Sequence, residues 1–147
     1  MAIVDRSRGR AEDPGVLLDE WMGHLTQLVD AVEGWVRELD WSTRRIEKKM
    51  EDSVLGSYEA PVLLMQRETT RVLLEPIARF VPGADGVVDL YWMPAYDDIA
   101  SLYLVEGRWR LHYVYPDTGA IDKGANAIPL TKETLSKVLD DMCSHVA

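Results

Sequence analysis

Residues 87–115 read VVDLYWMPAYDDIASLYLVEGRWRLHYVY, three apolar runs separated by two turn signals. The first signal begins at Pro94, and the second is the pair Glu106-Gly107. Connections this short join antiparallel neighbours, because parallel strands need a crossover of about a dozen residues or more. The stretch therefore predicts three strands of an antiparallel meander. They cover residues 87–93, 99–105 and 108–115.

The register of these strands follows from the turns. A two-residue turn at Glu106-Gly107 pairs Val105 with Arg108, and pairing Met93 with Ile99 extends the register to the first strand. Side chains alternate between the two faces of a sheet, so the apolar ones gather on one side. They are Val88, Leu90, Trp92, Ala100, Leu102, Leu104, Trp109, Leu111 and Tyr113. We expect helices to cover this face.

The opposite face is polar and aromatic, and it carries the candidate site. The predicted cross-strand rows are Tyr91–Ser101–His112 and Asp89–Tyr103–Arg110. Tyrosine and arginine are enriched where protein interfaces bind most strongly. The candidate residues for binding a ligand or a partner are Asp89, Tyr91, Tyr103, Arg110 and His112. Three interpretations stay open: the solvated side of an antiparallel sheet, a protein interface, and a cleft for a small molecule.

A heptad stripe of apolar residues precedes the sheet. Its members are Leu18, Trp21, Leu25, Leu28, Val32, Trp35 and Leu39. Asp13 and Pro14 are typical of an N-cap and a first helical position. Because the stripe continues through Ile46 and Met50, we predict a helix over residues 14–52. At about 1.5 Å per residue it would exceed the size of one domain, so it either breaks near residues 40–43 or projects toward a partner.

The remaining segments complete an α+β fold. Strands are predicted over residues 62–66 and 71–81, with a bulge or a sheet edge at Pro76, which cannot donate a ladder hydrogen bond. A second helix is predicted over residues 131–146, capped by Thr131. The predicted architecture is a long N-terminal helix, an antiparallel meander of about five strands, and a C-terminal helix packed on one sheet face. Residues 1–12 are expected to be a flexible lead and residues 13–147 a single domain.

Composition and charge restrict the class of protein. Sixteen basic and 25 acidic residues give a net charge of −9, which repels nucleic acid and anionic membrane surfaces. One stretch departs from this acidic character, the basic run RRIEKK at residues 44–49. It is a hypothetical site for a phosphate or an acidic peptide. The single cysteine, Cys143, excludes an intrachain disulfide and favours a reducing cytoplasm. No stretch is long and apolar enough to predict a membrane span.

Motifs for catalysis, cofactors and metals are not recognisable in the sequence. His112 has a side chain suited to general-base chemistry, but the predicted register gives it no acid in its own row. The run Cys143-Ser144-His145 is not a catalytic arrangement, since consecutive helical residues point in different directions. Gly83, Gly86 and Gly107 fall in predicted turns, and none belongs to a phosphate-binding pattern that leads into a helix. We therefore expect no cofactor and no metal, and the sequence favours a non-catalytic role over an enzyme.

These observations lead to two main hypotheses. The first is a protein-interaction module, an adaptor, inhibitor or immunity-type partner, that forms a homodimer through its long helix. The alternative is a small-molecule-binding protein or enzyme that uses the Tyr/Arg/His face of the sheet. A third hypothesis, nucleic-acid regulation through the basic run, is disfavoured by the net charge.

Overall fold

The computed structural model describes residues 13–94, 97–113 and 127–144, with the backbone alone at residues 97 and 98. The predicted flexible lead, residues 1–12, therefore lies outside the described residues. The elements in chain order are α2 (Pro14–Glu38), β1 (Ser42–Asp52), β2 (Gly56–Arg67), β3 (Thr70–Val81), β4 (Ala84–Met93), β5 (Asp97–Val105), β6 (Arg108–His112), β7 (Ile128–Pro129) and α3 (Lys132–Ser144).

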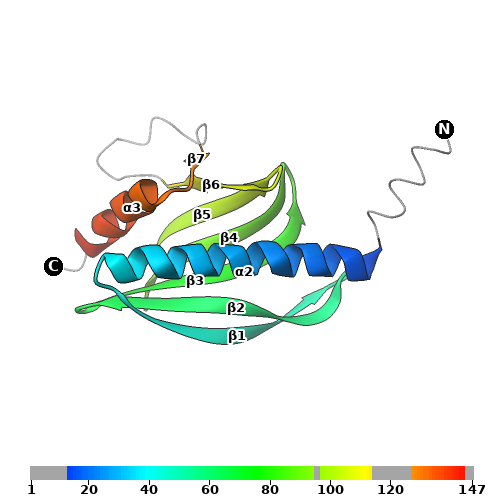
Figure 1. The fold of residues 1–147 in the computed structure, drawn as a ribbon, viewed down its shortest axis with the longest axis horizontal. Coiled ribbons are helices and arrows are strands. Elements are labelled where there is room, and N and C mark those ends of the chain that lie inside the picture. The colour runs from blue at the N-terminus through cyan, green and yellow to red at the C-terminus, as the bar shows by residue number, and fades with distance from the viewer. Residues whose placement is uncertain (1–12, 95–96, 114–126, 145–147) are drawn as a thin grey trace.

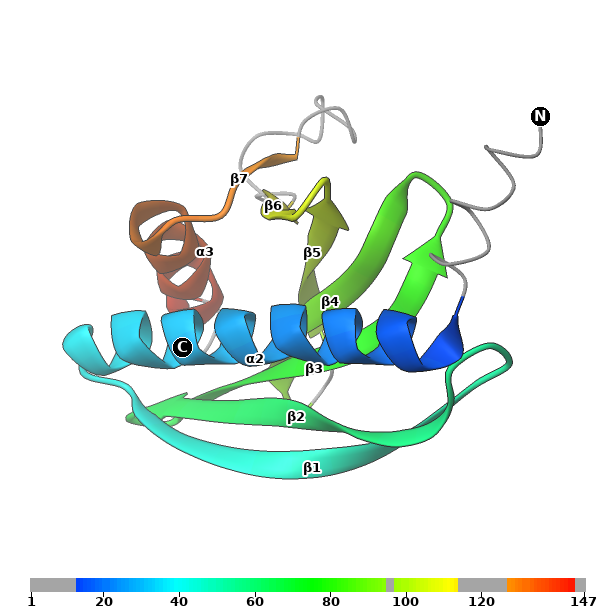
Figure 2. The same ribbon diagram turned by 45° about the vertical axis from the view of Figure 1, so that its right-hand side comes forward.

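The strands form one antiparallel sheet of seven, in which each strand lies beside its neighbour in sequence. The sheet curves around α2, which runs along its inner side, and α3 packs at the end near β6 and β7 (Figures 1 and 2). The predicted α+β class is confirmed, but the strand count is higher than the predicted five. Neither helix in the described ranges has a stretch apolar and long enough to cross a membrane.

The N-terminal helix is shorter than predicted. Its start is confirmed, since the Gly15 amide donates a 2.9 Å hydrogen bond to Asp13 Oδ1. It ends at Glu38, and Asp40 adopts a φ of 71°, a left-handed conformation that commonly terminates helices. The alternative of a break near residues 40–43 is therefore confirmed. Residues 42–52 form strand β1, so the predicted helix over this segment is wrong. Ile46 and Met50 misled the prediction because residues four apart lie on one face of a helix and of a regular strand.

Most of the apolar stripe of α2 is buried against the sheet, whereas its members Leu18, Trp35 and Leu39 are partly buried. Trp21, Leu25, Val32 and Val36 are all 0% exposed, and they belong to the same core cluster as the inward side chains of β2 to β6. A helix that turns its stripe onto its own sheet does not need a second copy to bury it. The heptad stripe that motivated the prediction of a homodimer through this helix is therefore explained by packing within one chain.

The predicted register is confirmed for one pair of strands and wrong for the other. Between β5 and β6 it is confirmed, including the Tyr103–Arg110 and Ser101–His112 pairs. Between β4 and β5 it is wrong by two residues, because β5 begins at Asp97 and the register shifts between Leu90 and Trp92. A shift of two leaves every side chain on its predicted face. The irregularity predicted at Pro76 is also present, in the pairing of β3 with β4.

The predicted apolar face forms the core, with the exception of Trp92, which is partly buried and does not belong to the core cluster. The buried members are Val88, Leu90, Ala100, Leu102, Leu104 and Leu111. Trp109 and Tyr113 are partly buried and pack against this core, and the Trp109 ring centroid lies 6.3 Å from that of Trp21. Helix α3 adds Leu135, Val138, Leu139 and Met142. Its predicted cap is confirmed, as the Thr134 amide donates to Thr131 Oγ1 at 3.1 Å.

Candidate functional site

The predicted site residues share the sheet face opposite the two described helices. We call this surface the open face and define it by Asp89, Tyr91, Ser101, Tyr103, Arg110 and His112. All six are partly buried, while alternate residues on the same strands lie in the core. The strands β4, β5 and β6 hold them at fixed spacings, because their backbones are paired on both sides. The face therefore presents a rigid, mixed polar and aromatic surface.

The corrected register changes the rows on the open face. They are Asp89–Ser101–His112 and Val87–Tyr103–Arg110, instead of the predicted rows. Asp89 thus lies in the row of His112, with Ser101 between them. Ser101 Oγ donates to Asp89 Oδ1 at 2.9 Å, and the Tyr91 hydroxyl donates to Asp89 Oδ2 at 3.4 Å.

This order of side chains differs from that of a hydrolytic triad. In a triad the imidazole lies between the acid and the nucleophile, so that it can accept the nucleophile's proton. Here the hydroxyl lies between the carboxylate and the imidazole, and the Ser101 proton is directed to Asp89. The row is a hydrogen-bonded polar cluster and does not supply an activated serine.

Burial raises the pKa of the Asp89 carboxyl above its ordinary value. The hydrogen bonds from Ser101 and Tyr91 act in the opposite direction, and the negative charge of Glu75 adds to the increase. Glu75 is itself held by Lys48, whose Nζ lies 2.9 Å from Glu75 Oε2. The polar cluster thus extends across the sheet from β1 to β5, and Asp89 is partly buried within it.

The raised pKa predicts a specific effect of pH on stability. Folding favours protonated Asp89, so its contribution to the free energy of unfolding should fall as pH rises through the folded-state pKa. The test measures the free energy of unfolding in urea for wild type and Asp89→Asn between about pH 7 and pH 4. This range lies above the pKa of an unfolded aspartate, which is about 3.9. Wild type should gain stability relative to the variant as the pH decreases. If the difference in free energy of unfolding between the two proteins did not change with pH, this would contradict the raised pKa of Asp89.

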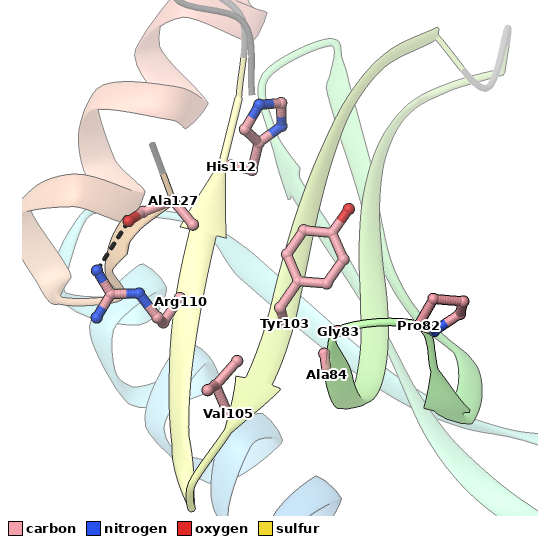
Figure 3. A pocket seen from close by; sticks show the side chains of 8 residues that line it. All are labelled: Pro82, Gly83, Ala84, Tyr103, Val105, Arg110, His112 and Ala127. Carbon is pink, nitrogen blue, oxygen red and sulfur yellow. Dashed lines mark hydrogen bonds between the residues drawn. The ribbon is translucent and has the colours of Figure 1, made fainter. Parts of the chain in front are cut away.

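A pocket of about 380 Å³ opens on this face (Figure 3). Its lining is Pro82, Gly83, Ala84, Tyr103, Val105, Arg110, His112 and Ala127. Three of the five predicted residues therefore meet at one place, whereas Asp89 and Tyr91 do not line the pocket. Arg110 turns toward the pocket's side wall, where its Nη2 donates to the Ala127 carbonyl at 2.8 Å (Figure 3). The lining contains hydroxyl, imidazole and guanidinium groups and no carboxylate.

Sequence reasoning missed the walls of this pocket. Pro82 and Gly83 form the β3–β4 turn and Ala84 begins β4. The Pro-Gly signal predicts a turn but not what lies beside it. Ala127 precedes β7, a two-residue strand within a segment predicted to be a connection. These contacts depend on how the whole sheet curves, which no local pattern records.

The basic run 44–49 does not form the predicted basic helix end. It lies in β1, where Arg45 contacts Asp30 at 2.7 Å and Glu33 at 2.6 Å. Lys48 reaches Glu75 on another strand. Acidic neighbours therefore neutralise two of its four cations, which weakens the phosphate-binding hypothesis. Within the described ranges, no three His, Cys, Asp or Glu side chains gather closely enough to hold a metal ion.

Comparison with known proteins finds no protein-family model, no curated protein and no solved structure that matches this chain. An inference about function therefore depends on the geometry of the open face and its pocket.

Proposed function

We propose that the protein is a non-catalytic protein-interaction module that binds a partner protein through the open face. The observation that carries this proposal is the division of the sheet. The described helices pack on its inner side, and the tyrosine, arginine and histidine side chains of the other side stay partly exposed. Such residues supply large contact areas and several hydrogen bonds at the centres of interfaces.

The open face is also preorganised for binding. Arg110 is held by the Ala127 carbonyl, and Asp89 by Ser101 and Tyr91. Binding through side chains that are already ordered loses less conformational entropy than binding through free ones. A rigid surface with donors and acceptors at fixed positions favours one partner over others.

The proposal covers an adaptor, an inhibitor or an immunity-type protein, and it includes a cytoplasmic location. A chain with a single cysteine cannot form an intrachain disulfide, which supports a reducing compartment. The partner can be another protein or a second copy of this chain. Analytical ultracentrifugation of the purified protein separates these cases.

The test is affinity capture from an extract of the native host, comparing wild type with Tyr103→Ala/Arg110→Ala. Each truncation at an interface centre costs about 2 kcal/mol or more, so recovery of the partner should drop at least about tenfold. The matched control is Glu20→Ala/Thr26→Ala, which removes two exposed side chains of α2. Circular dichroism and the midpoint of thermal unfolding should show that both variants fold. Equal recovery with all three proteins would refute the proposal.

A small-molecule-binding function is the second candidate, and the pocket favours it. A volume of about 380 Å³ lies within the range of about 300–1,000 Å³ that is usual for ligand sites. Native mass spectrometry of the protein purified from its host distinguishes this candidate. A bound small molecule that is lost in Arg110→Ala/His112→Ala, without specific capture of a protein, would replace the first proposal by the second.

A further inference from the structure

Strand β1 forms a long free edge of the sheet. It is the first strand in the order β1 to β7, and it lies at the outer margin of the sheet in both views (Figures 1 and 2). Its pairing with β2 runs over eleven residues without a register shift. Proteins commonly protect an edge with a short strand, a proline or a bulge. β1, which is described over its whole length, has none of these.

The outer backbone groups of β1 have no strand to pair with in the part of the chain that the structure describes. Along an antiparallel ladder, alternate residues direct their N–H and C=O groups to opposite sides. Those that face away from β2 can bind a further strand through the same hydrogen bonds that hold the sheet. Charged side chains discourage unrelated strands, but they favour a strand with the complementary order of charges.

The charges of β1 are complementary to those of an antiparallel copy. Residues directly opposite in such a ladder either both exchange hydrogen bonds or both do not, so a two-fold axis between identical strands passes through a residue. An axis through Lys48 brings opposite charges together at three positions, each made twice by the symmetry. The pairs are Arg44 with Asp52, Arg45 with Glu51, and Glu47 with Lys49.

Each neighbouring register brings like charges together, which destabilises a strand pair. The contacts are Arg44 with Lys48 for an axis through Ile46, Arg45 with Lys49 for an axis through Glu47, and Glu47 with Glu51 for an axis through Lys49. Among these registers, the axis through Lys48 is therefore the favourable one. It also places Ile46, which is 41% exposed, opposite Met50.

The like-charge contact in the favourable register is already neutralised. Lys48 lies opposite its own copy at the axis, but its Nζ lies 2.9 Å from Glu75 Oε2 and donates to the Pro76 carbonyl at 3.0 Å. Both partners belong to β3, so the side chain reaches across β2, where the opposing residue is the small Ala60. The ammonium group is thus directed away from the free edge.

A contact between two acids also favours a cation at this edge. Glu47 lies beside Glu59 of β2, and the interaction of the two carboxyl groups raises the pKa of Glu47. In the register centred on Lys48, Lys49 of the second copy lies opposite Glu47. Its positive charge stabilises both carboxylates.

We propose that β1 pairs antiparallel with β1 of a second copy of this chain, with the two-fold axis at Lys48. The resulting homodimer has a sheet that continues from one copy into the other. This surface is separate from the open face, so each copy keeps its open face accessible.

Analytical ultracentrifugation of the full chain tests the dimer. We expect a concentration-dependent equilibrium between the 16.6 kDa chain and a species of twice that mass. Glu47→Lys and Lys49→Glu should each weaken the dimer about tenfold, because each replaces two opposite-charge contacts by like-charge contacts. The double variant Glu47→Lys/Lys49→Glu pairs opposite charges again and should recover most of the affinity. Glu20→Lys, an exposed charge reversal on α2, is the control and should not weaken the dimer.

Disulfide trapping tests the register. In a Cys143→Ser background, Lys48→Cys should cross-link two copies on mild oxidation. Opposite residues in an antiparallel pair have Cα atoms about 4.5–5.5 Å apart, which is within disulfide range. Lys49→Cys should cross-link poorly, because in this register it lies opposite Glu47 and not opposite its own copy. Circular dichroism shows whether each variant folds.

Several results would overturn the proposal. They are a monomer at every concentration, a double variant as weak as the single ones, and cross-linking through Lys49→Cys but not through Lys48→Cys. Tyr103→Ala/Arg110→Ala should still form the dimer. Its dissociation would place the second copy on the open face instead, so failure of this proposal is distinguishable from failure of the proposed function.

Discussion

Trp21→Ala is expected to lower the free energy of unfolding by about 3–5 kcal/mol, the usual cost of removing a fully buried large aromatic side chain. The Trp21 side chain is 0% exposed and belongs to the core between α2 and the sheet. Its ring lies against Trp109, and its Nε1 donates to the Tyr58 hydroxyl at 3.0 Å. The substitution therefore leaves a cavity and removes the donor that Tyr58 accepts from. Urea unfolding followed by circular dichroism measures the loss.

Trp21→Phe separates the two contributions. It retains much of the ring volume but removes the indole N–H, so it should cost less than Trp21→Ala. Where Trp21→Ala does not fold, Trp21→Leu supplies the measurement. A loss below about 1 kcal/mol for the alanine variant would be typical of a surface position. It would show that Trp21 does not hold α2 on the sheet.

The parts of the fold that were predictable depend on short-range constraints. A two-residue turn at Glu106-Gly107 leaves one register for its hairpin, and that register is observed. The stripe of α2 identified the helix and its buried side, because its spacing is that of a helix. Where a turn is longer, as at Pro94, several registers satisfy the same pattern of alternation. The prediction there was wrong by two residues.

Strands β1 and β7 could not be found in the same way. β1 is an edge strand whose side chains are mostly charged and exposed, so it lacks an apolar alternation to identify it. Charge on an edge strand also discourages pairing with other chains. β7 has two residues, fewer than any periodic pattern needs. Both segments are strands because they pair with a neighbouring strand, β2 for β1 and β6 for β7, and not because of a pattern in their own sequence.

The candidate site was predictable in its face but not in its shape. Tyr103, Arg110 and His112 meet at one pocket because alternation survives a register error of two residues. That register error also put Asp89 into the wrong row, so its hydrogen bond with Ser101 was missed. The contact between Trp21 of α2 and Trp109 depends on where the helix crosses the sheet. A stripe specifies which side of a helix is buried and leaves its position on the sheet undetermined.

Gly86→Ala is expected to destabilise the protein by about 1–3 kcal/mol through overpacking. Gly86 lies in β4, and a Cβ at this position would lie 2.4 Å from Cζ3 and 2.6 Å from Cη2 of Trp21. Carbon atoms attract one another at about 3.5–4.0 Å and repel strongly at such short separations. Trp21 cannot easily move away, since Tyr58 and Trp109 hold its ring. Gly86 was predicted to lie in a turn, and this is wrong, because it lies within β4 at a point where the helix and the sheet meet.

A double-mutant cycle tests whether that contact is the cause. In a Trp21→Leu background the indole atoms that oppose the new methyl group are absent, so Gly86→Ala should cost less there than in wild type. The coupling free energy should lie within about 0.5–3 kcal/mol, as for residues in contact. Gly34→Ala is the control, because Gly34 is exposed on α2 with no atom within 4 Å of an added Cβ. It should stabilise the protein by about 0.5–1 kcal/mol, and an equal cost of Gly86→Ala in both backgrounds would contradict the proposed contact.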